Sequence, residues 1–207
     1  ATVASGVDSA GIGRPLSAGL EAAANAAEGK LVVNGFGHHQ SLAADQYRRV
    51  AAALHELQVE RGLRTVMVTS ALPQEGKTLT VTNLALTLSE SYARRVLLID
   101  ADLRRPAIHT LLGIGNQSGL SEALASPRSE LPLAHVSSRL AVLTSGRPDV
   151  HPLAGLTSDR MRALLQEASD RFDWVLLDTP PVALLPDASL LAGLTEGVVL
   201  VIRAGAT

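Results

Sequence analysis

The sequence predicts an α/β fold with a doubly wound, mostly parallel sheet and helices on both faces. Short apolar runs alternate along the chain with segments of helical periodicity, which is typical of βαβ units. Two of these runs, Val96–Ile99 and Val175–Leu177, are continuously apolar, as expected of strands covered on both faces. With 207 residues, 46% of them hydrophobic, the chain is long enough to bury the core of one such domain.

The individual elements follow from apolar spacing and from residues that begin or end helices. The range Ser41–Arg61 is predicted to be an amphipathic helix with Ser41 as its cap. Val50, Leu54 and Leu57 recur within it at helical spacing. Further helices are expected over Leu79–Ser89, Ile108–Leu112, Leu120–Ala125, Ser158–Phe172 and Ala188–Ala192, and strands over Thr65–Thr69, Val96–Ile99, Leu140–Leu143, Val175–Leu177 and Val198–Ile202. Apart from its short helices, the range Pro106–Ser138 is expected to be irregular.

The first part of the chain differs in composition from the rest. Residues 1–30 are rich in Ala, Gly and Ser, and we expect a flexible segment there with a weak helix over Leu16–Glu28. Leu31–Val33 is predicted to be a short edge strand, and the domain is expected to span residues 31–207. The chain stops at Thr207, soon after its last apolar run, and we expect it to be truncated at its C-terminus.

Composition narrows the function classes. A formal net charge of −2 and an aromatic content of 2% argue against nucleic acid as a partner. The absence of cysteine excludes disulfides and thiolate chemistry and fits a cytoplasmic protein. No apolar run approaches the ~20 residues that a membrane-spanning helix needs.

The segment between the first core strand and the next helix has the composition of a phosphate-binding loop. Residues 71–78 follow the strand Thr65–Thr69 and end in Gly76-Lys77-Thr78. In such a loop, backbone N–H groups bind phosphate, the lysine reaches the outer phosphates and the hydroxyl binds magnesium. Ala71 stands where the first glycine of the usual pattern would be, so a turn that merely caps a helix is the alternative. The residues expected to contact a nucleotide are Pro73, Gln74, Glu75, Gly76, Lys77, Thr78 and Leu79.

Three aspartates directly follow predicted strands. Asp100 and Asp102 follow Val96–Ile99, and Asp178 follows Val175–Leu177. In open α/β sheets the ligand lies beyond the carboxyl ends of the strands. A single aspartate there is more often a turn former or a helix cap. Three of them together with a phosphate loop favour a site for a nucleotide with magnesium.

These motifs resemble those of the bacterial tyrosine kinases (BY-kinases). Residues 70–78, Ser-Ala-Leu-Pro-Gln-Glu-Gly-Lys-Thr, resemble the Walker A motif of that family, which tolerates Ala at the first glycine. Leu98–Arg104 resembles its second motif, Walker A′, and Leu176–Pro181 resembles its Walker B motif. Residues 186–188, Pro-Asp-Ala, are also similar, and the resemblance extends from about Leu31 to the C-terminus.

The resemblance implies an ATP- and Mg2+-dependent, non-specific protein-tyrosine (auto)kinase. Such an enzyme regulates the polymerisation and export of capsular polysaccharide or exopolysaccharide. In this interpretation Lys77 holds the β- and γ-phosphates, and Asp100 accepts the proton of the tyrosine. Magnesium is bound by Thr78, Asp102 and Asp178, and Arg104 helps to hold the phosphates or the second motif.

The resemblance also implies partners and a location. The partners are a membrane chain-length regulator or activator of polysaccharide export, protein tyrosine substrates and further copies of the chain in a homo-oligomer. The location is the cytoplasm, peripheral to the inner face of the plasma membrane. In the ring-forming helix of similar proteins, Glu-x-x-Arg-x-x-Arg is common; here Asp45 and Arg48 keep part of it but Ala51 replaces the last Arg. We therefore expect weak self-association.

Two other functions stay open from the sequence. One is an ATP-driven switch like the proteins that position septa and partition plasmids. These proteins carry an additional early lysine in a glycine-rich loop, where this chain has Leu72 and Pro73. The other is a nucleotide-binding regulatory subunit without kinase activity, because the family's C-terminal tyrosine cluster is absent and Tyr47 and Tyr92 are the only tyrosines.

Overall fold

The computed structural model describes residues 40–126, 130–148, 152–183 and 186–204, and a single six-stranded sheet organises them. The strands are β1 (Thr65–Ser70), β2 (Val96–Asp100), β3 (Ala134–His135), β4 (Leu140–Leu143), β5 (Trp174–Asp178) and β6 (Gly197–Val201). Their order across the sheet is β3-β4-β2-β5-β1-β6. All pairings are parallel except that of β3 with β4. The predicted α/β fold with a mostly parallel sheet is confirmed.

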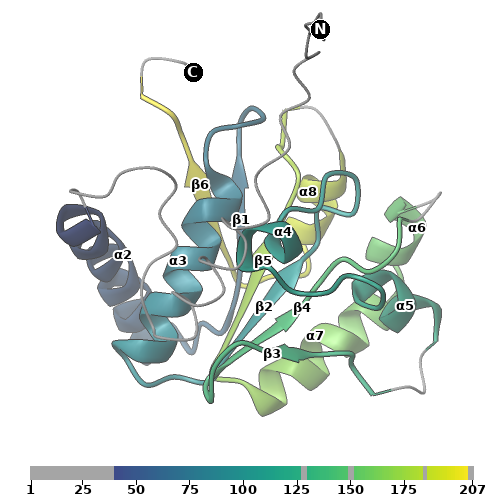
Figure 1. Ribbon diagram of the computed structural model, residues 1–207, viewed down its shortest axis with the longest axis horizontal. Helices are drawn as coiled ribbons and strands as arrows, with labels where there is room; N and C mark the ends of the chain where they lie inside the picture. Colours follow the sequence, from purple (N-terminus) through teal and green to yellow (C-terminus); the bar gives the residue numbers. More distant parts are fainter. Residues whose placement is uncertain (1–39, 127–129, 149–151, 184–185, 205–207) are drawn as a thin grey trace, which may run out of the picture.

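Helices cover both faces of this sheet (Figure 1). They are α2 (Gln40–Arg61), α3 (Lys77–Glu90), α4 (Ile108–Leu112), α5 (Leu120–Ala125), α6 (Pro152–Leu156), α7 (Asp159–Arg171) and α8 (Pro186–Ala192). The buried side chains of α2, α3 and α4 belong to one core cluster, and those of α5 to α8 belong to another. Within the described ranges, no helix is long and apolar enough to cross a bilayer.

The two core clusters are separated by the sheet itself. Val66 and Val68 of β1 face the cluster under α3, whereas Met67 between them faces the cluster under α7. The same alternation holds along β2 and β5, whose residues are all buried. Because β2 and β5 have apolar neighbours on both faces, their residues before the final aspartate are continuously apolar rather than alternating.

The predicted elements within the described ranges are found with ends that differ from expectation by at most two residues. Two elements were not predicted. β3 (Ala134–His135) lies in the range expected to be irregular, and two residues are too few for a periodic pattern. Helix α6 (Pro152–Leu156) begins with the proline that favours a first helical turn. The flexible segment 1–30, its weak helix and the edge strand Leu31–Val33 lie outside the described residues.

The position of Ala51 in α2 is relevant to self-association, because similar proteins have an Arg there in the helix that forms the oligomeric ring. Arg48 and Asp45 pair on the surface, with 2.9 Å between Nη1 and Oδ1. Ala51, one turn further on, is fully buried in the core cluster with α3. This position therefore packs against the domain itself, and a long charged side chain there would have to displace core contacts.

The entry ends of β2 and β5 are joined by a reciprocal contact. The backbone N–H of Arg95 donates to Oδ2 of Asp173 (2.8 Å), and the N–H of Asp173 donates to the carbonyl of Arg95 (2.8 Å). The Arg95 guanidinium also lies 2.9 Å from Oδ1 of Asp173. Hydrogen bonding from this guanidinium holds the pKa of the Asp173 carboxyl below its ordinary value. Ionised Asp173 therefore stabilises the start of the two strands more than its protonated form does.

The substitution Asp173→Asn is expected to lower the urea midpoint of unfolding at neutral pH. The pKa of Asp173 in the folded chain lies below the ordinary 3.8, so its contribution is present above that value and is lost as pH falls through the folded pKa. The deficit of the variant should therefore shrink at acidic pH. Asp170→Asn, in an exposed acid near the end of α7, is the control. A deficit of Asp173→Asn that stays constant at all pH values would contradict this account.

Candidate active site

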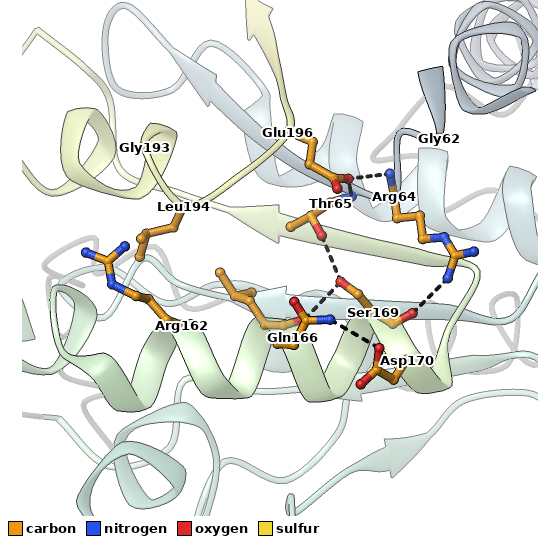
Figure 2. Close-up of a pocket in the computed structure, with 11 residues that line it drawn as sticks. Gly62, Arg64, Thr65, Arg162, Gln166, Ser169, Asp170, Gly193, Leu194 and Glu196 are labelled. Carbon is orange, nitrogen blue, oxygen red and sulfur yellow. Dashed lines mark hydrogen bonds between the residues drawn. The ribbon is translucent and has the colours of Figure 1, made fainter. Parts of the chain in front are cut away.

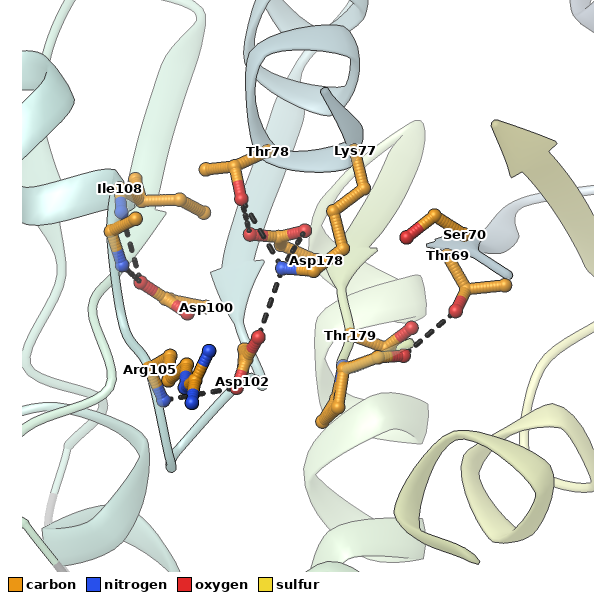
Figure 3. Close-up of polar contacts among 12 residues, drawn as sticks. Thr69, Ser70, Lys77, Thr78, Asp100, Asp102, Arg105, Ile108, Asp178 and Thr179 are labelled. Carbon is orange, nitrogen blue, oxygen red and sulfur yellow. Dashed lines mark hydrogen bonds and ion pairs between the residues drawn. The ribbon is translucent and has the colours of Figure 1, made fainter. Parts of the chain in front are cut away.

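The exit ends of β1, β5 and β2 lie side by side, and their register sets which side chains meet. Val68 of β1 is paired with Asp178 of β5, and Asp100 of β2 is paired with the same Asp178. The loop after β1 and the segment after β2 therefore lie on either side of the end of β5 (Figure 3). This arrangement confirms that the three motifs found in the sequence come together at one edge of the sheet.

The loop between β1 and α3 is held in a defined conformation by its own residues. The Ser70 hydroxyl donates to the carbonyl of Leu72 (2.7 Å), and the N–H of Leu72 donates to Oε2 of Glu75 (2.7 Å). Gln74 and Gly76 have positive φ angles of 65° and 94°. Oε1 of Glu75 also accepts the N–H of Arg203 (3.2 Å), beyond the end of β6. Glu75 thus ties the loop to the neighbouring strand.

Lys77 is the first residue of α3 and lies between two carboxylates. Its Nζ is 2.9 Å from Oδ2 of Asp102 and 3.5 Å from Oδ1 of Asp178. The side chain is only 11% exposed. Burial acts to lower the pKa of Lys77, but the negative charges of Asp178 and Asp102 outweigh it, and the pKa is raised. The lysine is therefore positively charged at neutral pH.

Thr78 and Asp178 bring a hydroxyl and a carboxylate together beneath Lys77. Oγ1 of Thr78 donates to Oδ2 of Asp178 at 2.6 Å. Asp178 is fully buried, and this burial raises its pKa to about 6, although Lys77 and the hydroxyl of Thr78 act in the opposite direction. The two oxygens form a compact donor set on the loop side of the site.

Asp100 lies deeper than the other acids. Its Oδ2 accepts the N–H groups of Ala107 and Ile108, both at 3.1 Å, and so satisfies the start of α4. Its Oδ1 is buried and has no hydrogen-bond partner among the described residues. Burial, reinforced by the charge of Asp178, raises the pKa of Asp100 to about 8. At neutral pH, Asp100 therefore holds its proton in this state of the protein.

The segment after β2 forms the opposite wall. Oδ1 of Asp102 accepts the N–H of Arg105 (3.0 Å), which folds the chain back on itself. The guanidinium of Arg104 binds Asp187 at the start of α8, with 2.8 Å between Nε and Oδ2. Asp187 was noted in the sequence only as part of a motif, and nothing in the spacing showed that it would meet Arg104. The contact depends on α8 being placed beside the Walker A′ segment.

A cavity of about 500 Å³ opens between the loop and this wall. Of the residues predicted for the site, it is lined by Pro73, Gln74, Lys77, Asp102 and Arg104, and in addition by Arg105, Ala107, Pro180 and Pro181. Thr78 and Asp178 adjoin it through Lys77, whereas Asp100 lies behind the wall. The second arginine of the Walker A′ segment was thus missed, although it directly follows Arg104 in the sequence.

A second cavity, of about 380 Å³, lies at the opposite ends of the strands (Figure 2). Its polar groups satisfy one another. Oε2 of Glu196 accepts the N–H groups of Arg64 (2.6 Å) and Thr65 (2.8 Å), and the Thr65 and Ser169 hydroxyls are 3.0 Å apart. This cavity lies at the entry ends of β1 and β6, away from the phosphate loop. We therefore interpret this cavity as a surface hollow whose hydrogen bonds hold neighbouring elements together.

The oxygen atoms of the first site suit a magnesium ion bound together with phosphates. Within the described ranges, no group of three or more His, Cys, Asp or Glu side chains forms a metal cluster. Magnesium, however, is usually held by one or two carboxylates, with waters and substrate phosphates completing its shell. Thr78, Asp102 and Asp178 provide this kind of partial donor set, so the residues fit.

The chain is similar in sequence to known proteins. The tyrosine-protein kinase YwqD of Bacillus subtilis is 39% identical to this chain over 170 residues, which are 81% of this chain and 71% of YwqD. The chain belongs to the bacterial tyrosine kinases. BY-kinase Etk of Escherichia coli is 37% identical over 79% of this chain, which spans only 23% of the length of Etk. No protein-family model matches the chain.

Solved structures agree with this assignment. The Escherichia coli Etk kinase domain has a TM-score of 0.75 and 36% identity, covering 80% of this chain and 65% of the Etk chain. The septum site-determining protein MinD of Pyrococcus horikoshii, solved with Mg-ADP, has a TM-score of 0.55 and 21% identity, covering 67% of this chain and 57% of MinD. At that identity the match shows the fold alone. The chain is thus a tyrosine-kinase domain, and MinD has a similar fold.

The conformation of Gly76 leads to a testable difference between two glycines. Gly76 (φ 94°) and Gly62 (φ 72°) both have left-handed backbones, and a Cβ at either would have nothing within 4 Å. Replacement of either by Ala should therefore cost about 1–2 kcal/mol through the backbone alone. Only Gly76→Ala should weaken nucleotide binding, because only Gly76 shapes the phosphate loop. Urea unfolding and calorimetry with ATP·Mg measure both effects, and equal binding by the two variants would refute this role.

Proposed function

We propose that this domain uses ATP and Mg2+ to phosphorylate tyrosines on proteins, including copies of itself. The observation that carries this proposal is the cluster of Lys77, Asp102, Asp178 and Thr78 at the phosphate loop. Phosphoryl transfer needs positioned phosphates and neutralised charge more than covalent chemistry. A lysine, a hydroxyl and two carboxylates within hydrogen-bond distance of one another provide those means.

Lys77 is proposed to exchange partners when the nucleotide binds. In the structure its charge is balanced by Asp102 and Asp178. Bound Mg2+ would supply positive charge to the phosphate oxygens and to those two carboxylates. Lys77 could then turn its ammonium group toward the β- and γ-phosphates, while the N–H groups of the loop from Pro73 to Leu79 hold the phosphate chain.

Asp100 is proposed to accept the proton of the tyrosine hydroxyl. A base works best when its pKa is close to the working pH, and burial raises the pKa of Asp100 to about 8. Because Asp100 holds a proton at neutral pH when no ligand is bound, it would have to release that proton as Mg2+ and phosphates bind. Its Oδ1, which has no hydrogen-bond partner among the described residues, would then be the oxygen available for the tyrosine proton. Since Asp100 lies behind the cavity wall, the substrate hydroxyl must approach it past the segment that carries Asp102.

We propose the wider role from family membership. Regulation of capsular polysaccharide or exopolysaccharide polymerisation and export is the process in which these kinases work, with a membrane chain-length regulator as activating partner. The proposed location is the cytoplasm, peripheral to the inner face of the plasma membrane. Self-association through α2 belongs to the same proposal and is expected to be weak, because Ala51 is buried where similar proteins have an Arg and Arg48 pairs with Asp45 of its own helix.

The two alternative functions make different demands on the site. A partitioning or septum-positioning switch shares the fold, as the MinD neighbour does, but its additional loop lysine has no counterpart at Leu72 or Pro73. A regulatory subunit without activity would need no complete set of phosphate, metal and proton-accepting groups. The presence of that set in one place favours the kinase.

The substitution Lys77→Met tests the proposed phosphate contact. Loss of the ammonium group removes a charge-assisted bond to phosphate, so the affinity for ATP·Mg should fall by about 10-fold or more. The control is Arg162→Met, which also removes a positive charge but lies at the second cavity, at the opposite ends of the strands. Calorimetry gives the affinities and circular dichroism checks the fold. Unchanged affinity in a folded Lys77→Met variant would remove Lys77 from the site.

Transfer to tyrosine tests the reaction itself. We expect phosphate to appear on an added tyrosine-rich peptide but only weakly on the two tyrosines of this chain. The ring of Tyr92 packs near His55 (5.5 Å between centroids), and its hydroxyl donates to the carbonyl of Arg48 (3.4 Å). Tyr47 is partly buried within α2, so both would need local unfolding to enter a neighbouring site.

Incubation with labelled ATP·Mg and mass spectrometry measure this transfer, with a Tyr47→Phe/Tyr92→Phe double variant as control. That variant should phosphorylate the peptide as well as the parent does. Release of phosphate without any phosphotyrosine would point to the ATPase switch. Nucleotide binding without turnover would point to the regulatory subunit.

A further inference from the structure

Two adjacent arginines lie on the wall of the nucleotide cavity, and their surroundings differ. Arg104 and Arg105 both line it, opposite the loop residues Pro73 and Gln74. Both side chains are exposed. The family resemblance gave Arg104 two alternative roles, holding the phosphates or holding the second motif, and gave no role to Arg105. The contacts of the two guanidinium groups lead to a different assignment.

The guanidinium of Arg104 binds a carboxylate of α8. Its Nε and Nη2 lie 2.8 and 3.5 Å from the two carboxylate oxygens of Asp187. Asp187 is only 1% exposed, so loss of its partner would leave a buried carboxylate without a counter-charge, which is strongly unfavourable. Hydrogen bonding to Asp187 also raises the pKa of Arg104. This arginine therefore ties the cavity wall to α8, and turning to a phosphate would break that tie.

Arg105 has its backbone fixed but its side chain unpaired. Its N–H donates to Oδ1 of Asp102 (3.0 Å) and also lies 3.2 Å from the Asp102 carbonyl. Two residues later, Asp100 holds the N–H of Ala107. Among the described residues, no carboxylate lies within ion-pair distance of the Arg105 guanidinium. A side chain on a backbone anchored on both sides can reach into the cavity at a small entropic cost.

The charge balance of the cavity singles out the same residue. Lys77 is neutralised by Asp102 and Asp178, and Arg104 is neutralised by Asp187. Of the cations that line the cavity, Arg105 is the one whose charge no described carboxylate balances. An anionic ligand is therefore attracted most strongly toward Arg105. A guanidinium can bind two phosphate oxygens at once, which suits the spread of charge over a transferred phosphoryl group.

We propose that Arg105, and not Arg104, binds the γ-phosphoryl oxygens of the nucleotide from the wall opposite the phosphate loop. This inference rests on the proposed kinase function. It predicts that Arg105 distinguishes ATP from ADP, because ADP lacks the group that it contacts. Arg104 and Asp187 hold the wall in place and contribute equally to the binding of both nucleotides.

The test compares Arg105→Gln with Arg104→Gln by calorimetry, using Mg-ADP and the non-hydrolysable β,γ-imido analogue of ATP. Arg105→Gln should bind the analogue about 10-fold more weakly and ADP with unchanged affinity, the loss expected for one charge-assisted bond. Arg105→Lys should recover part of that loss. Arg104→Gln should leave the ratio of the two affinities as in the parent.

Thermal unfolding of the same variants separates structure from binding. Arg104→Gln and Asp187→Asn should each lower the melting temperature, and the double variant should lose little more, because both remove one interaction. Arg105→Gln should melt like the parent. An unchanged affinity ratio in Arg105→Gln, or a reduced ratio in Arg104→Gln alone, would overturn the assignment. A parent protein that binds neither nucleotide would overturn the proposed function, and this inference with it.

Discussion

The parallel register of β1, β5 and β2 is the constraint on which the rest of the site depends. It places Asp178 beside Val68 on one side and beside Asp100 on the other. Because β1 continues into the phosphate loop and β2 into the Walker A′ segment, residues far apart in the chain meet at one sheet edge. A shift of one residue in either pairing would turn Asp178 to the other face of the sheet and separate it from Lys77.

The electrostatics of this edge explain why it suits a charged ligand. Three carboxylates and one lysine are gathered where little water can screen them, and burial raises the pKa of Asp100 and of Asp178 to about 8 and 6. Without a ligand, the proton on Asp100 and the ammonium of Lys77 offset two of the three negative charges of the cluster. Entry of a metal together with phosphates would replace both, so the same residues can hold the resting state and the loaded state.

Both walls of the cavity are anchored by hydrogen bonds to neighbouring elements. On the loop side, Glu75 ties the loop to the chain beyond β6, and Gly76 permits the left-handed turn from which α3 starts. On the other side, Asp100, Asp102 and Asp187 anchor the segment that carries the two arginines. Long side chains on a fixed backbone lose less freedom when they bind than side chains on a mobile loop. The site can therefore be selective although its cavity is open.

The sequence by itself determined the fold class, the helices and strands that carry strong periodicity, and the meeting of Lys77, Asp102 and Asp178. Local patterns suffice for these because short apolar runs bounded by charged residues and proline favour buried parallel strands, and the carboxyl ends of parallel strands lie at the same end of the sheet. Only the tertiary structure decided that Asp100 caps α4 behind the wall, that Arg104 turns to Asp187, and that β3 adds an antiparallel edge. Those features depend on how α4, α8 and the sheet edge pack in three dimensions. Sequence periodicity does not predict a contact between residues 83 positions apart, such as that of Arg104 with Asp187.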